Sequence, residues 1–300
     1  MKIFVVGSLN MDLVVKAPFM PENGMTITGE GFMTNPGGKG ANQAVALAKL
    51  GADAYMVGCV GDAFGNELKN TLCGYGVNTD FVEKVNGVSS GIAVIVVVDG
   101  DNRIILDAGS NAKITTELVD KALSVAEKGD YLVTQLEVSQ DIVAYSLKKA
   151  KEKGMITVLN PAPAAKLKDG ILEYCDFFIP NQSETKFYTG VYPEDEVSAR
   201  KCAEILAEKG VKNLLITMGE KGSAGIIDGK FRSAKCYKTN AIDTTAAGDT
   251  YVGGFVARLS AGDVPEAAMD FASRASSITC SRRGAQQSIP VKAEVDAKKA

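Results

Sequence analysis

Short apolar runs alternate with amphipathic segments along most of the chain. The apolar runs have the length and the β-branched content of buried strands, and they lie at 3–6, 54–57, 131–135, 156–160, 177–179 and 214–218. The amphipathic segments have helical spacing and lie near 41–50, 64–75, 139–153, 195–209, 249–260 and 265–281. Some of them are followed by a glycine typical of helix ends, such as Gly51 or Gly154. This alternation predicts an α/β fold in which a doubly wound, mainly parallel sheet is flanked by helices.

Two segments interrupt the alternation. Residues 13–33 contain the turn signals Pro21 and Gly24, and the run 92–98 is followed by the turn sequence DGDN and an apolar stretch at 103–106. Neither segment has a crossover helix, so both predict strands of a small separate sheet. We therefore expect one domain over residues 1–300, with a β-sheet lid formed by about 12–34 and 90–108.

The run 92–98 reads IAVIVVV and is apolar at both alternating sets of positions. A strand of this kind needs an apolar cover on each face. The main domain can supply one cover, and the same sheet of a second copy, related by a two-fold axis, can supply the other. The pattern predicts a homodimer through the lid. The alternative is that 92–98 is a central strand buried inside the main domain.

Composition and charge give no sign of several kinds of partner. Acidic residues number 36 against 33 Lys and Arg, and the sequence pI is about 5.3, so charge gives no reason to expect nucleic acid or an anionic membrane. The apolar run 3–6 is too short for a signal sequence or a membrane span, which predicts a cytoplasmic protein. Six cysteines without a C-x-x-C pair predict reduced thiols used in packing: Cys59, Cys73, Cys175, Cys202, Cys236 and Cys280.

Histidine is absent from the sequence. Its absence excludes a Ser-His or Cys-His nucleophile, a His-ligated zinc site and a His general base, because each of these needs a neutral imidazole. Acid–base chemistry must therefore depend on Asp, Glu, Lys, Tyr or Cys.

Polar clusters follow the predicted strands. Each alone is an ordinary cap or turn, but in open α/β sheets ligands bind beyond the carboxyl ends of the strands, so their joint placement predicts a site. The clusters contain Asn10 and Asp12, Glu137, Asn160, Asn181 and Glu184, and the sequence TMGEKG at 217–222.

A glycine cluster, NPGGKGANQ, precedes the first predicted helix. Gly37, Gly38 and Gly40 allow a close approach of the backbone to a ligand. The cluster is not a Walker A loop, because Lys39 is followed by Gly40, and the first strand carries no G-x-G-x-x-G. The polar side chains that suit the paired hydroxyls of a sugar are Asp12, Lys39, Asn42 and Glu137.

A second small-residue stretch, AIDTTAAGDTYVGG at 241–254, leads into a predicted helix. Taken alone it is an ordinary loop with a helix cap. However, GSLNMD, GGKGANQAVA, QLE, LNPAPA, PNQSE, TMGEKG, DTTAAGDT and RRGAQQSIP follow one another in the order of the ribokinase family of carbohydrate kinases. The chain resembles this family over essentially its whole length.

The resemblance implies a ribokinase-like fold and ATP-dependent phosphorylation of a sugar. GGKGANQ, NPAPA and Ala246 favour D-ribose, phosphorylated at its 5-hydroxyl, over fructose or adenosine. Two departures from the family pattern are the pair Tyr251 and Val252, which we expect to face the surroundings of the helix, and Ser273, which concerns packing of the adenine. The resemblance also implies a lid-mediated homodimer.

Roles for individual residues follow from the resemblance. Asp249 is expected to be the catalytic base, beside an anion hole of Ala246, Ala247 and Gly248. The expected sugar ligands are Asn10, Asp12, Gly38, Lys39, Asn42 and Glu137. The expected ATP-binding residues are Asn181, Thr217, Gly219, Gly222, Gly248 and Ser273. Mg²⁺ is expected to be held largely through water by Asn181 and Glu184, and K⁺ by oxygens of Asp243, Thr245, Thr279, Arg282, Gly284 and Ser288.

Two alternatives to a ribose kinase remain open at this point. One is a related kinase that acts on another pentose, deoxyribose, a ketohexose or a nucleoside, because motifs do not encode the stereochemistry of hydroxyl groups. The other is a sugar-binding or regulatory protein without turnover. Retention of Asp249 and the small residues before it argues against the second alternative.

Overall fold

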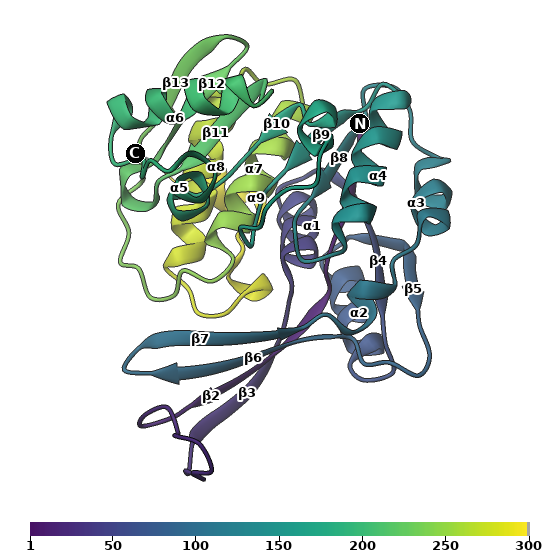
Figure 1. Cartoon of the computed structure of the whole chain (residues 1–300), viewed down its shortest axis with the longest axis vertical. Coiled ribbons are helices and arrows are strands. Elements are labelled where there is room, and N and C mark those ends of the chain that lie inside the picture. The colour runs from purple at the N-terminus through teal and green to yellow at the C-terminus, as the bar shows by residue number, and fades with distance from the viewer. Residues whose placement is uncertain (299–300) are drawn as a thin grey trace.

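A computed structural model describes residues 1–298 and contains a large sheet between two layers of helices (Figure 1). Within these residues the sheet has nine strands in the order β13-β12-β11-β10-β9-β8-β1-β4-β5. All pairs are parallel except those of β12 and β13 at one edge. The strands are β1 (Lys2–Val6), β4 (Asp53–Val60), β5 (Asn78–Lys84), β8 (Tyr131–Thr134), β9 (Ile156–Leu159), β10 (Phe177–Phe178), β11 (Asn213–Thr217), β12 (Ser223–Ile227) and β13 (Lys230–Ala234).

Helices cover both faces of this sheet. They are α1 (Lys39–Lys49), α2 (Gly65–Gly74), α3 (Thr116–Leu123), α4 (Gln140–Glu152), α5 (Gln182–Thr189), α6 (Glu196–Glu208), α7 (Ala247–Ser260), α8 (Pro265–Cys280) and α9 (Lys292–Ala297). Short 3₁₀ turns lie at Gly109–Lys113, Ile171–Tyr174, Gly219–Lys221 and Gln286–Ser288.

The buried side chains form two cores, one on each face of the sheet. Successive residues of a strand point to opposite faces, so Ile3 and Val5 of β1 join the core under α1, α7 and α8, whereas Phe4 and Val6 join the core under α3, α4 and α6. Burial on both faces explains why these strands read as continuous apolar runs.

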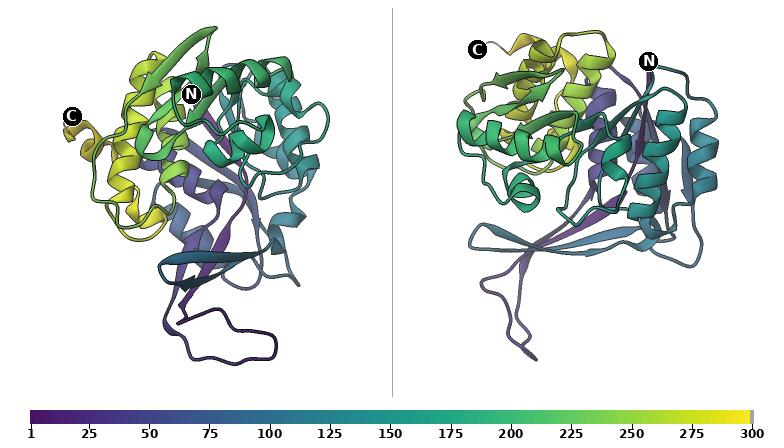
Figure 2. Two further views of the ribbon diagram at one scale, coloured as in Figure 1. Left: turned by 60° about the vertical axis from the view of Figure 1, so that its left-hand side comes forward. Right: turned by 45° about the horizontal axis from the view of Figure 1, so that its top comes forward.

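A second sheet extends from the main body (Figure 2). Its order is β3-β2-β6-β7, with β2 (Asn10–Lys16), β3 (Glu30–Gly37), β6 (Gly91–Val98) and β7 (Asp101–Asp107). The two central strands, β2 and β6, pair in parallel. The outer strands pair antiparallel with them, β3 with β2 and β7 with β6. The alternative that 92–98 is a central strand of the main sheet is therefore wrong.

The predicted α/β fold with a mainly parallel sheet is confirmed, and each predicted strand and helix is present within a few residues of its expected bounds. The pattern did not predict β5, β12, β13, α3, α5 or α9. No helix within residues 1–298 combines the length and apolar character that a bilayer crossing requires.

Candidate active site

The predicted polar clusters gather at one edge of the large sheet. Strands β1, β8, β9, β10 and β11 are parallel and lie in one continuous part of the sheet, so their carboxyl ends meet. Asn10, Glu137, Asn160 and Asn181 follow four of these ends, and the turn Gly219–Lys221 follows the fifth.

Glu137 is the centre of the first polar cluster. Its Oε2 accepts hydrogen bonds from Ser8 Oγ at 2.6 Å, from the main-chain N–H of Lys39 at 3.0 Å and from Asn10 Nδ2 at 3.3 Å. These three donors come from the segment between β1 and β2, from the first residue of β2 and from the first residue of α1, so the carboxylate joins the glycine cluster to the strand ends. Three of the expected sugar ligands, Asn10, Lys39 and Glu137, are in this cluster, and a fourth, Gly38, directly precedes Lys39.

The glycine cluster passes directly over β2. Gly38 has φ +91°, and a Cβ there would lie 2.8 Å from the nitrogen of Asn10 and 2.9 Å from the carbonyl oxygen of Ser8. A Cβ on Gly37 would lie 2.5 Å from Asp12 Oδ2. Side chains at these two positions would separate the segment from the polar groups that it now contacts.

Burial and like charges act on the carboxyl group of Asp12. Burial raises its pKa to about 7, and the neighbouring carboxylates of Glu137 and Asp249 add to this effect. Burial alone would lower the pKa of Lys39, but Asp249, Glu137 and Glu184 outweigh it and hold the pKa above its ordinary value. The site thus combines carboxyl groups that can bind hydroxyls with one firmly charged ammonium group.

Asp249 lies buried in the first turn of α7, against α1. Asn42 Nδ2 donates to its Oδ2 at 3.0 Å, and Gln43 Nε2 donates to its Oδ1 at 3.0 Å. Gln43 was not among the predicted site residues, although it stands beside Asn42 in the same motif. Its position next to Asn42 near the start of an amphipathic helix was the available signal.

The first turn of α7 has main-chain N–H groups that are only partly used by hydrogen bonds within the part of the chain that the structure describes. Ala246 precedes the helix with φ 60°, and its carbonyl accepts from both the N–H and the hydroxyl of Thr250 at 2.8 Å. The expected anion hole differs in one detail, because the N–H of Ala247 donates to the carbonyl of Thr244 at 3.1 Å. Among residues 1–298 no acceptor is found for the N–H of Gly248, which points out of the first turn of the helix.

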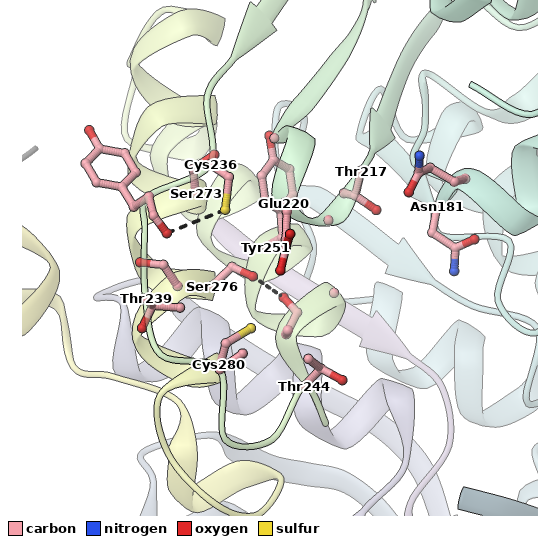
Figure 3. A pocket seen from close by; sticks show the side chains of 18 of the residues that line it. Asn181, Thr217, Glu220, Cys236, Thr239, Thr244, Tyr251, Ser273, Ser276 and Cys280 are labelled. Carbon is pink, nitrogen blue, oxygen red and sulfur yellow. Dashed lines mark hydrogen bonds between the residues drawn. The ribbon is translucent and has the colours of Figure 1, made fainter. Parts of the chain in front are cut away.

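A cavity of about 1000 Å³ adjoins this helix start (Figure 3). All six expected ATP-binding residues line it: Asn181, Thr217, Gly219, Gly222, Gly248 and Ser273. A volume of this size suits a nucleotide. The sequence did not indicate a further wall, formed by residues 236–241 together with Ser276, Ser277 and Cys280. This wall has no motif of its own.

The two residues of the pair Tyr251 and Val252, which departs from the family pattern, have different surroundings. Val252 is buried in the core, as expected. Tyr251 is also buried but lines the cavity, and its hydroxyl lies 2.6 Å from Ser223 Oγ.

The six cysteines are free thiols, as expected, but packing in the core does not explain all of them. Cys73 is exposed, and Cys236 and Cys280 line the cavity.

Asn181 and Glu184 form the N-terminal cap of α5. Glu184 accepts from the N–H of Asn181 at 2.8 Å and from its Nδ2 at 3.0 Å, and the N–H of Glu184 donates to Asn181 Oδ1 at 2.8 Å. Burial raises the pKa of Glu184. Within residues 1–298 no group of three or more acidic, Cys or His side chains is placed to bind a metal ion directly. An amide and one carboxylate can instead bind the water shell of a divalent ion.

Asp243 connects the loop before α7 to the segment after α8. Its Oδ1 accepts from the N–H and hydroxyl of Thr245 at 2.9 and 2.6 Å, and its Oδ2 accepts from the N–H of Gly284 at 2.9 Å. Burial raises its pKa, but these hydrogen bonds outweigh burial, so the pKa is lowered. Thr279 and Arg282 lie together at the end of α8, where the N–H of Arg282 donates to the carbonyl of Thr279 at 3.1 Å. Ser288 lies in the 3₁₀ turn that packs on α8.

Comparison with known proteins decides the family. The model of the pfkB family carbohydrate kinases matches residues 1–292. The chain belongs to this family. It is 39% identical to a ribokinase of Haemophilus influenzae, over 97% of this chain and 95% of the relative, and 37% identical to a deoxyribokinase of Salmonella typhi, over 97% and 96%. A structure of Arabidopsis thaliana ribokinase complexed with ribose and ATP superposes with a TM-score of 0.89 and 32% identity, covering 98% of this chain and 96% of that one. The ribokinase-like fold and the carbohydrate kinase assignment are confirmed.

Proposed function

We propose that this pfkB-family kinase transfers the γ-phosphoryl group of ATP to the 5-hydroxyl of D-ribose, giving ribose 5-phosphate and ADP. The observation that supports it best is the place of Asp249. This buried carboxylate accepts a hydrogen bond from Asn42 of the glycine cluster and stands one residue after Gly248, which lines the cavity. A sugar held by the cluster would place its hydroxyl between the base and the phosphate chain.

The proposed reaction needs one proton acceptor and a stabilised anion. Asp249 would take the proton of the sugar hydroxyl as the bond from that oxygen to the γ-phosphorus forms and the bond to the bridging β,γ-oxygen breaks. The N–H of Gly248 and the dipole of α7 favour the anionic phosphoryl oxygens at the helix start. The ammonium group of Lys39, held among carboxylates, can compensate further negative charge. Mg²⁺ bound with the nucleotide would supply charge neutralisation between its phosphates.

An assay of ADP release with a panel of acceptors tests the substrate. We expect kcat/KM for D-ribose to exceed that for 2-deoxyribose, fructose and adenosine by about tenfold or more, because a site built to bind a hydroxyl discriminates against an acceptor that lacks or misplaces it. A higher kcat/KM for 2-deoxyribose would favour the activity of the Salmonella typhi relative. No ADP release with any acceptor would favour a sugar-binding protein without turnover.

We propose that a monovalent cation, K⁺, binds beside the loop of Asp243 and Thr245. The carboxylate of Asp243 and the hydroxyl of Thr245 lie together beside Gly284, and they supply oxygen atoms that suit such an ion. The bound ion would fix the loop that leads into the anion hole. We expect turnover in K⁺ to exceed turnover in Na⁺ by about tenfold, because fixed N–H donors contribute strongly to stabilisation of the developing charge. Equal rates in K⁺, Na⁺ and a bulky organic cation at matched ionic strength would contradict this role.

We propose that the second sheet is a lid that closes over the sugar and pairs with the lid of a second copy. Large apolar side chains are exposed on this sheet: Phe32, Met33, Val94, Ile104, Ile105 and Leu106. Apolar side chains gathered in this way mark an interaction surface.

The substitution Val96→Asp tests this pairing. We expect a dimer by light scattering at micromolar concentration, and dissociation with reduced activity in Val96→Asp, because a charge on the paired strand must be buried without a partner. Val197→Asp, at an exposed position of α6, is the matched control and should remain dimeric. A fully active monomer before any substitution would show that the lid is covered in another way.

A further inference from the structure

Gln43 is fully buried, and both its side-chain oxygen and its NH₂ group form hydrogen bonds within the protein. We propose that Gln43 is a positioning residue, which fixes the orientation of the Asp249 carboxylate; this inference rests on the role of base proposed for Asp249. Gln43 Nε2 donates to Asp249 Oδ1 at 3.0 Å and to Asn160 Oδ1 at 3.1 Å, and Gln43 Oε1 accepts from Gln135 Nε2 at 2.6 Å.

The orientation of this amide is determined by a backbone group. Asn160 Nδ2 donates to the carbonyl of Ile179 at 2.8 Å, and a carbonyl can only accept. Asn160 must therefore direct its Oδ1 toward Gln43, and the NH₂ group of Gln43 must donate to that oxygen. The same NH₂ group faces Asp249, so the carboxylate always meets a donor there.

The network joins three strand ends to the base. Gln135 follows β8, Asn160 follows β9 and Ile179 follows β10. Gly7 leaves space for Gln135, because a Cβ on Gly7 would lie 2.3 Å from Gln135 Oε1. Hydrogen bonds through Gln43 therefore connect Asp249 of α7 to the carboxyl ends of three strands.

Asn42 and Gln43 hold the two oxygens of Asp249 but differ in what else they can do. Among residues 1–298, Asn42 Oδ1 is buried without a hydrogen-bond partner, so Asn42 keeps one unused acceptor. Gln43 has no such spare group, because its oxygen and its NH₂ group are already bonded. With both oxygens held, the carboxylate cannot rotate, and its remaining lone pairs stay directed for one incoming hydroxyl.

A double-mutant cycle tests this role in the full-length enzyme. Gln43→Met keeps the length of the side chain and removes its hydrogen bonds. We expect it to lower kcat with ribose by about 10- to 100-fold, as small misplacements of reacting groups do, and to change KM for ribose by less than about threefold. In the Asp249→Asn background the same substitution should lower kcat by less than about threefold, because Gln43 acts only through that carboxylate.

The outcomes separate this proposal from the proposed base. Equal fold losses in both backgrounds would overturn the positioning role, because a merely structural role costs the same in each. An unchanged kcat in Asp249→Asn would overturn the proposed mechanism itself. A rise in KM with unchanged kcat would make Gln43 a sugar ligand and would also overturn its role as a positioning residue.

A second variant keeps the test decisive if Gln43→Met does not fold. Gln135→Met leaves Gln43 in contact with Asp249 but removes its bond at Oε1. We expect a smaller loss of kcat in the same direction, again absent in the Asp249→Asn background. A loss of the same size in both backgrounds would contradict the network.

Discussion

Asp249→Asn is expected to lower kcat by about 10²- to 10⁴-fold while the KM for ribose changes much less, because the amide has the shape of the carboxylate but cannot accept the proton. Histidine is absent from the chain. The neighbouring carboxyl group of Glu137 already accepts three hydrogen bonds, and that of Asp12 lies on β2 among the expected sugar ligands. Steady-state rates of ADP release over a range of ribose concentrations measure both constants.

The control for this variant is Asp53→Asn. Asp53 is exposed at the first residue of β4, at the opposite end of a parallel strand from the site. It should have the kcat and KM of the unsubstituted enzyme. Turnover of Asp249→Asn within about threefold of its Asp53→Asn control would contradict the assignment of the base.

Gly248→Val is expected to lower kcat by about 10²-fold or more without loss of thermal stability. A Cβ at Gly248 meets no atom within 4 Å, so the protein itself tolerates a side chain there. That open space lies at the wall of the cavity, where the proposed reaction would bring the γ-phosphoryl group. Loss of a single donor to a developing anion already costs about 10² to 10³ in kcat. Melting temperature and ADP release measure the two effects separately.

Gly74→Val is the matched control for Gly248→Val. Gly74 is also a helical glycine with open space around its Cβ, at the end of α2 and outside the cavity. Its variant should keep full activity. A fully active Gly248→Val enzyme would show that the phosphoryl group passes elsewhere.

The apolar pattern predicts the strands that are buried on both faces, because continuous burial removes polar positions from them. It misses β5 and β13, which lie at the two edges of the sheet and have mixed exposure, and it misses β12, which is largely buried but has Ser223 and Gly225 among only five residues. β12 and β13 nevertheless form a hairpin whose turn, Asp228-Gly229, has positive φ at both residues and is a recognised hairpin signal. The helices α3 and α5 have eight residues each, too few for a clear periodicity.

The site could be predicted where a short motif carries the chemistry. Asn42 and Asp249 fall in glycine-containing motifs, and they lie in contact although they are far apart in the sequence. The wall at 236–241 could not be predicted, because it contributes surface rather than reactive groups, and its position depends on how the chain runs from β13 to α7. The engaged N–H of Ala247 is a detail of turn geometry that residue types do not determine.

The strands of the second sheet, which is proposed to be a lid, begin and end beside the polar cluster. Asn10 is the first residue of β2, Gly37 is the last residue of β3, and Asn111, which follows β7, donates to Asn10 Oδ1 at 2.7 Å. Any hinge motion of this proposed lid would therefore move the proposed sugar ligands themselves. Apparent affinity for the sugar then equals the intrinsic affinity of the closed form multiplied by the fraction of molecules that are closed. Substitutions that shift this conformational equilibrium, even far out on the lid, would change sugar affinity without touching the sugar.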